Sequence, residues 1–193
     1  ATGNDLTGIT GADAITVADG ADVTLTVAQA NIAKTVTDNG AGNLTAAGTV
    51  TVTAATGANL ASGLTSTGVD VIVLTGGENY TLTTAQALIS KIGGSGTAGT
   101  VTDGGTVTVT AATGNDLTGI TGADAITVAN GADVTLTAVQ ALLAKTVTDN
   151  GAGNLTAAGT VTLMAVSGDD MTGNTGADAI TVANGADVTL TAV

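Results

Sequence analysis

The chain is built from one sequence unit used repeatedly. The segment 1–26, ATGNDLTGITGADAITVADGADVTLT, returns at 112–137 with Asn130 in place of Asp19 as the single change. A further copy begins at 166, and a diverged copy occupies 55–111. Self-similarity of this kind divides the chain into four copies, at 1–54, 55–111, 112–165 and, in part, 166–193. Any fold for this chain must therefore repeat one structural unit.

Glycine marks a finer period inside each copy. In the first copy Gly3, Gly11, Gly20, Gly40 and Gly48, followed by Gly57 of the next copy, are separated by 8, 9, 20, 8 and 9 residues. Between them, stretches such as VTLTV at 23–27 and TVTVT at 49–53 alternate Val or Leu with Thr, which is typical of half-buried strands. Glycine supplies the positive φ that tight corners require. Units of about nine residues, taken in pairs, predict a coil of about 18 residues.

These features predict an all-β fold, a parallel β-solenoid of short strands with Gly, Asp and Asn corners. The alternative is a string of tandem small β-sandwiches. The 54-residue copy is short for an immunoglobulin-like domain of about 100 residues, and the chain has no Trp. The three extra residues of the second copy fall within 58–67, which predicts a loop there.

One stretch in each complete copy favours helix. The three stretches are TVAQANIAK at 26–34, TTAQALISK at 83–91 and TAVQALLAK at 137–145. Each forms either a short helical turn, with its Lys favourably placed at the C-terminal end, or an ordinary wide corner.

Composition excludes several classes of function. The formal net charge is −13, from sixteen acidic residues and three lysines, which argues against binding nucleic acid or anionic membranes. No apolar run approaches the roughly 20 residues of a membrane-spanning helix, so we expect no membrane insertion. The chain has no His and no Cys, and general acid–base catalysis would need a strongly shifted carboxylate or lysine. We therefore expect a protein that is not an enzyme.

The segment GITGADAIT at 8–16 resembles the glycine–aspartate nonapeptide of the RTX family of secreted bacterial proteins, matching it at Gly8, Gly11, Asp13 and Ile15. The resemblance implies a parallel β-roll whose aspartates hold Ca²⁺ between coils. Candidate ligands are the aspartates of three copies: Asp5, Asp13, Asp22, Asp116, Asp124, Asp133, Asp170, Asp178 and Asp187.

The spacing of these aspartates limits how they can cooperate. Asp13 and Asp22, nine residues apart, are expected on opposite sides of one coil, whereas Asp5 and Asp22, 17 apart, are expected to stack. Calcium takes six to eight oxygen ligands, so a site needs matched corners from two coils. Asp and Asn are also common corner residues because their side chains bond to nearby backbone N–H groups. Both turn chemistry and Ca²⁺ binding stay open.

The Thr, Ala and Gly content, the acidity and the RTX-like corners resemble repeat regions of large secreted bacterial proteins of the surface-layer and adhesin type. This implies a structural, extracellular rod at the cell surface that self-associates or continues into further repeats of the same chain, as a layer, filament or stalk. Uncapped solenoid ends expose strand edges, which favours such stacking. The alternative is an ice-binding β-solenoid, with outward threonines of TVTVT and TLT aligned in ranks.

Overall fold

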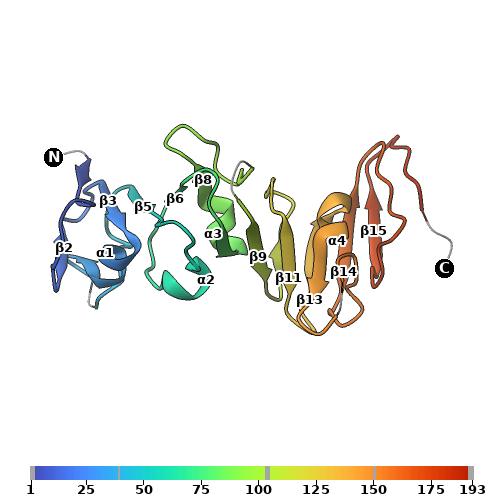
Figure 1. Ribbon diagram of the computed structural model, residues 1–193, viewed down its shortest axis with the longest axis horizontal. Coiled ribbons are helices and arrows are strands. Elements are labelled where there is room, and N and C mark those ends of the chain that lie inside the picture. Colours follow the sequence, from blue (N-terminus) through green and yellow to red (C-terminus); the bar gives the residue numbers. More distant parts are fainter. Residues whose placement is uncertain (1–2, 39, 103–104, 150, 191–193) are drawn as a thin grey trace. The chain divides into compact units, whose positions relative to one another are not determined.

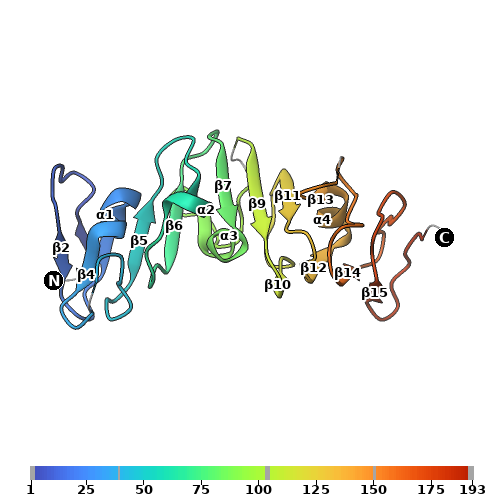
Figure 2. The same cartoon turned by 90° about the horizontal axis from the view of Figure 1, so that it is seen from below.

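The computed structural model describes residues 3–38, 40–102, 105–149 and 151–190 (Figures 1 and 2). It separates into two compact units, one of Ala1–Thr81 with Ala85–Gly105 and one of Leu82–Thr84 with Thr106–Val193. The strands are β1 (Asn4–Asp5), β2 (Ile15–Val17), β3 (Val23–Thr26), β4 (Ala33–Thr35), β5 (Val50–Thr53), β6 (Val71–Leu74), β7 (Tyr80–Thr83), β8 (Ser90–Ile92), β9 (Val107–Ala111), β10 (Asn115–Asp116), β11 (Ala125–Val128), β12 (Val134–Thr137), β13 (Ala144–Thr146), β14 (Val161–Ala165) and β15 (Ala179–Val182). The helices are α1 (Val27–Ile32), α2 (Leu60–Gly63), α3 (Thr84–Ile89) and α4 (Ala138–Leu143).

Strands pair in parallel within each unit. In the first unit β1, β3, β5, β6 and β8 form one sheet and β2 pairs with β4. In the second unit β10, β12, β14 and β15 form one sheet, and β11 lies between β9 and β13. Sandwich domains are built from antiparallel sheets, so this pairing favours the predicted parallel class over tandem small sandwiches.

The register of the ladders matches the nine-residue glycine spacing at some pairs and departs from it at others. Thr16 pairs with Lys34, 18 residues later, and Lys34 pairs in turn with Asn43, nine residues later. Thr24 pairs with Thr51, 27 residues later. Other stacked pairs have intermediate separations, such as Thr51 with Val71 and Asn43 with Thr67. The step between stacked positions therefore varies, and the expectation of a uniform 18-residue coil is wrong. The longer step accommodates the helix and the additional corner between β3 and β5.

The core is thin and aliphatic, as the composition predicts. Along β3 and β5 inward side chains such as Leu25, Val50 and Val52 are fully buried, and the threonines between them are half-buried. Parallel pairing satisfies the backbone N–H and carbonyl groups of these strands. The side chains that fill the core between them are Val, Leu and Ile, as is typical of buried parallel strands. Tyr80, the one aromatic residue of the chain, is buried, and its hydroxyl accepts a hydrogen bond from the Thr75 N–H at 3.0 Å.

The helix-favouring stretches do form short helices, α1, α3 and α4. At α1 the Thr26 hydroxyl accepts from the Gln29 N–H at 3.3 Å and Gln29 Oε1 accepts from the Thr26 N–H at 2.8 Å, a complete capping box. The expected lysines do not cap these helices, because Lys34 and its equivalents lie in the strands that follow. The predicted loop at 58–67 contains one helical turn, α2, which begins after Asn59.

Glycine is required at the corners for two reasons, a positive φ angle or a lack of space for a Cβ atom. Gly20 has φ +72°, the positive value predicted for a tight corner. Gly48 is required for a different reason: a Cβ atom there would lie 2.5 Å from Asp22 Oδ1 and 2.7 Å from the Gly20 carbonyl oxygen. The equivalent Gly159 would meet Asp133 Oδ1 at 2.5 Å. Stacked corners therefore approach too closely for any side chain at this position.

The close approach at Gly48 predicts a measurable cost of one methyl group. We expect Gly48→Ala to lower the free energy of unfolding by about 1–3 kcal/mol, because neighbouring backbone must move. Gly94→Ala is the matched control, since a Cβ there meets nothing within 4 Å, and it should stay within about 0.5 kcal/mol of wild type. Urea denaturation followed by circular dichroism measures both. Equal stability of the two variants would contradict the packing at Gly48.

Candidate functional site

The predicted aspartates fall into three sets, each with its own backbone contact. In the first set, Asp5 Oδ1 accepts hydrogen bonds from the Thr7 hydroxyl at 2.7 Å and from the Thr7 N–H at 2.9 Å. These two bonds lower the pKa of the Asp5 carboxyl. The same turn recurs, with lowered aspartate pKa values, at Asp116–Thr118 and at Asp170–Thr172. This set closes local turns.

The second set joins stacked corners. Asp22 Oδ1 accepts from the Thr49 N–H at 2.7 Å, and Asp133 Oδ1 accepts from the Thr160 N–H at 2.6 Å. In the fourth copy the backbone N–H of Asp187 donates to Ser167 Oγ at 3.2 Å. The ladder places Asp5 opposite Thr24, two residues beyond Asp22. The expected direct stacking of Asp5 on Asp22 is therefore wrong.

The third set joins one copy to the next. Asp124 Oδ2 accepts from the Val107 N–H at 2.8 Å, while the Asp124 N–H donates to the Val107 carbonyl oxygen at 2.9 Å. Asp178 makes the same two bonds with Val161, at 2.8 and 3.0 Å. Asp13, the equivalent residue of the first copy, is exposed. We call this two-bond arrangement the Asp–Val clamp.

The second copy contains a third clamp residue that was not among the predicted ligands. Asp70 Oδ2 accepts from the Val50 N–H at 2.8 Å, and the Asp70 N–H donates to the Val50 carbonyl oxygen at 3.0 Å. Divergence of the second copy hides its motif, although Gly68, Asp70 and Ile72 keep the spacing of Gly11, Asp13 and Ile15. That retained spacing was the available signal.

The described aspartates make their hydrogen bonds singly and do not gather into a cluster of acidic side chains. Among residues 3–38, 40–102, 105–149 and 151–190, no three acidic side chains gather where they could hold one ion. Calcium needs six to eight oxygens, whereas the contacts above direct single carboxylates to backbone N–H groups. The arrangement fits turn and clamp chemistry, and Ca²⁺ binding at these residues stays a prediction.

Asp38, which was not among the predicted ligands, is the centre of a hydrogen-bond network. Asp38 Oδ2 accepts from the Thr35 hydroxyl at 2.6 Å and from the Ala46 N–H at 3.1 Å, and the Thr35 side chain is fully buried. The Thr35 hydroxyl is the main cause that lowers the pKa of Asp38. Asp149 repeats the arrangement in the third copy, also with a lowered pKa. Both follow the strand that carries the lysine of each copy.

A glutamine in each complete copy was also missed by sequence reasoning. Gln29 is buried, and its Nε2 donates to the carbonyl oxygens of Leu6 at 2.6 Å and Ile9 at 2.9 Å. Gln140 makes the equivalent bonds to Leu117 and Ile120, at 2.6 and 2.8 Å. The recurrence of Gln at one position of every helix-favouring stretch was its signal. Each of these two glutamines joins its helix, by hydrogen bonds, to backbone carbonyl oxygens of an earlier turn in the same copy.

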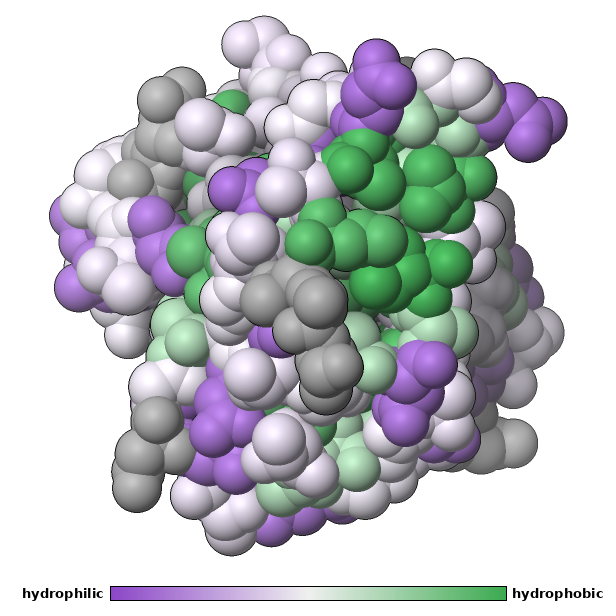
Figure 3. Space-filling view, turned by 90° about the vertical axis from the view of Figure 1, so that its right-hand side faces the viewer, coloured by the Kyte–Doolittle hydropathy of each residue, from purple (hydrophilic) through white to green (hydrophobic). Residues whose placement is uncertain are grey.

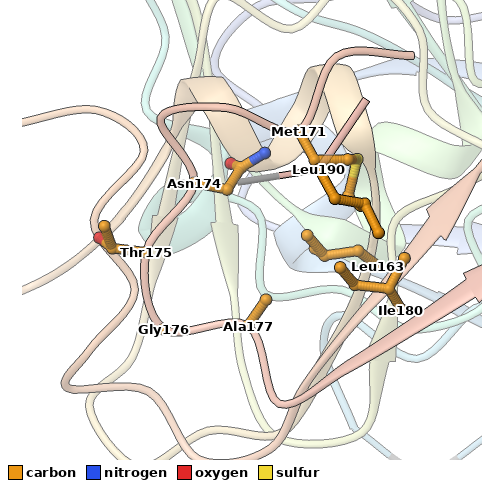
Figure 4. A pocket seen from close by; sticks show the side chains of 8 residues that line it. All are labelled: Leu163, Met171, Asn174, Thr175, Gly176, Ala177, Ile180 and Leu190. Atoms are coloured by element: carbon orange, nitrogen blue, oxygen red, sulfur yellow. The ribbon is translucent and has the colours of Figure 1, made fainter. Parts of the chain in front are cut away.

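The fourth copy carries a cavity of about 350 Å³ where β14 and β15 leave the core open. Figure 4 shows Leu163, Met171, Ile180 and Leu190 grouped there, with Asn174 beside them. Hydrophobic side chains also gather on the face that Figure 3 presents, the side of Figure 1 toward which β15 lies. Within the described part of the chain, both amide atoms of Asn174 are buried without a hydrogen-bond partner.

Comparison with protein-family models, with curated proteins and with solved structures finds no match to the chain. Among the described residues, no helix combines the length and the apolar character needed to cross a membrane.

The Asp–Val clamp predicts a stability difference between two equivalent aspartates. Asp70→Ala leaves the buried Val50 N–H without its acceptor, which should cost about 1–2 kcal/mol in the free energy of unfolding. Asp13→Ala removes the same carboxylate where the described residues provide no such strand, so its effect should stay within about 0.5 kcal/mol. Parallel urea titrations measure the difference. Equal losses in the two variants would show that the clamp does not stabilise the stack.

The lowered pKa values of Asp38 and Asp149 predict acid sensitivity. A carboxyl with a folded pKa below its unfolded value near 3.8 stabilises the fold above that value, and the contribution disappears as pH falls through the lower folded pKa. Replacing both residues with Asn should therefore reduce the loss of stability between pH 5 and about pH 2. Denaturation midpoints across this range provide the measurement. Asp19→Asn, which the third copy carries naturally as Asn130, controls for the removal of charge.

Proposed function

We propose that the chain is a non-catalytic structural repeat segment of a bacterial cell-surface protein, extracellular, whose coils continue as a parallel β-solenoid. In this proposal the segment forms a rod that associates with further repeats or further molecules into a layer, filament or adhesin stalk. The observation that carries it is the recurrence of one set of backbone contacts, the Asp–Val clamp, at successive copies.

The clamp supports a stacking role because it belongs to the junction between copies. Its N–H to carboxylate distance is 2.8 Å at Asp70, Asp124 and Asp178. Each copy thus presents the same acceptor to the strand before it, and an interface that repeats in one direction extends without closing. Linear growth is the property required of a rod or stalk.

The side-chain inventory supports a role without catalysis. The chain has no His, no Cys and a single Glu. The carboxylates with lowered pKa values are held by threonine hydroxyls and backbone N–H groups in turns. A general base at neutral pH needs a pKa near the working pH, whereas these shifts move in the opposite direction.

One observation favours the ice-binding alternative. Thr24 stacks on Thr51 and Thr26 stacks on Thr53, which makes a rank of paired outward threonines. The next level of the same sheet replaces them with Val71 and Val73. The aligned threonines therefore extend over two adjacent strands, β3 and β5, at this point. Because the threonine surface is this small, we rank the ice-binding function second.

Sedimentation velocity at rising protein concentration tests the proposed assembly. We expect species larger than the monomer whose proportion increases with concentration, because each stacking contact repeats. The same series with Ca²⁺ and with a chelator tests the calcium prediction, and circular dichroism on the same samples reports any metal-coupled folding. A monodisperse monomer at millimolar concentration under both conditions would contradict the assembly.

A further inference from the structure

Within the described residues, one edge of the first copy lacks the strand that pairs at the equivalent edge of later copies. Where the first and second copies meet, β6 pairs with β5, and the same contact joins β15 to β14 where the third and fourth copies meet. The corresponding strand of the first copy is β2, which pairs on its other edge with β4. Among the described residues, no strand of the β5 type pairs with β2.

Two contact points define what a filled junction requires. One is the Asp–Val clamp, for which Asp13 provides the exposed carboxylate in the first copy. The other is a glycine against backbone: a Cβ at Gly68 would lie 2.6 Å from the Leu44 carbonyl carbon, and one at Gly176 would lie 2.5 Å from that of Leu155. The equivalent Gly11 has open space within 4 Å.

Backbone hydrogen bonds accompany the glycine contact. The Thr67 N–H donates to the Gly42 carbonyl oxygen at 2.8 Å, and the Leu44 N–H donates to the Thr67 carbonyl oxygen at 3.1 Å. The fourth copy repeats both bonds, at 2.9 Å between Thr175 and Gly153 and at 3.0 Å between Leu155 and Thr175. The segment that fills such a junction therefore corresponds to 42–54. Its residue Leu44 lies against the glycine Gly68, and its residue Val50 bonds to the aspartate Asp70.

Burial agrees with an open junction at the first copy. Ile9 and Ile120 are the same residue of the repeat, yet Ile9 is 51% exposed and Ile120 is 3% exposed. Leu6 is half-buried, while its equivalent Leu117 is fully buried. Apolar side chains that the third copy buries thus lie uncovered beside Gly11 and Asp13.

We propose that the outer edge of β2, with Gly11, Asp13 and Ile9, is a strand-acceptor site. Its partner is an extended polypeptide segment of the repeat's own second-half sequence, GNLTAAGTVTVTA as at 42–54, which adds parallel to β2. The main chain provides affinity through ladder bonds, and the Asp13 carboxylate sets the register by accepting the N–H of the first valine. This inference rests on the proposed stacking of repeats and names its receiving surface.

A labelled peptide tests the site directly. The probe is acetylated and amidated GNLTAAGTVTVTA bearing fluorescein, and fluorescence anisotropy measures its binding to the full chain. A second peptide, N-methylated at the first valine, lacks the N–H that the clamp needs. We expect at least tenfold weaker binding of the methylated peptide to wild type, and of the unmodified peptide to Asp13→Ala.

Two glycine variants separate steric docking from backbone strain. Gly11→Ala places a methyl group where the partner's backbone must lie, so it should weaken peptide binding at least tenfold. Gly3→Ala is the matched control, because Gly3 has a similar φ of +78° against +73° and also meets nothing within 4 Å. Gly3→Ala and Asp19→Asn should bind the peptide as wild type does, and circular dichroism verifies that every variant is folded.

The outcomes distinguish this site from the assembly itself. Absence of peptide binding to wild type at millimolar concentration, or wild-type binding by Asp13→Ala and Gly11→Ala, would overturn the strand-acceptor site. If the chain still self-associates in sedimentation, the assembly stands without it. Peptide binding with the expected variant pattern by a chain that stays monomeric would support the site and contradict the assembly.

Discussion

Backbone hydrogen bonding between parallel strands is the interaction on which this structure depends. Apart from Tyr80, the hydrophobic core residues of the described chain are aliphatic, such as Leu25 and Val52, both fully buried, and parallel ladders join the strands that carry them. The first backbone N–H of each strand also needs an acceptor, and at that position the neighbouring segment is turning a corner. The carboxylates of Asp70, Asp124 and Asp178 accept that N–H, which extends the ladder into the corner.

The nine-residue spacing follows from the same requirement. A strand and a corner together use about nine residues, and several stacked positions are separated by one, two or three such units, as in Lys34 with Asn43, Thr16 with Lys34 and Thr24 with Thr51. Glycine occupies the corners for φ, as at Gly20, or for space, as at Gly48, where the stacked corner leaves no room for a methyl group. The insertion of the second copy lengthens the step between the paired strands β5 and β6, where Thr51 pairs with Val71, relative to the equivalent step in which Thr162 pairs with Ala179, and the segment that contains α2 accommodates it without loss of register.

Sequence alone predicted the elements more fully than their partners. Alternation of Val with Thr and the glycine spacing predicted the short strands, and the TVAQANIAK pattern predicted a helix as one of two choices. The role of Asp70 and the buried bonds of Gln29 were missed, because their partners lie 20 or more residues away in sequence. Asp5 was expected on Asp22 from a fixed 18-residue coil, and the two-residue offset follows from the actual register.

The acidity of the chain has a structural source that does not depend on a bound cation. A carboxylate is a stronger acceptor of a backbone N–H than a neutral side chain is, and Asp22, Asp38 and Asp70 each accept at least one. Asp22 and Asp133 each use Oδ1 for the backbone N–H of a stacked corner. A Ca²⁺ ion that left these two hydrogen bonds intact would therefore have to bind the other carboxylate oxygen, Oδ2, of each residue.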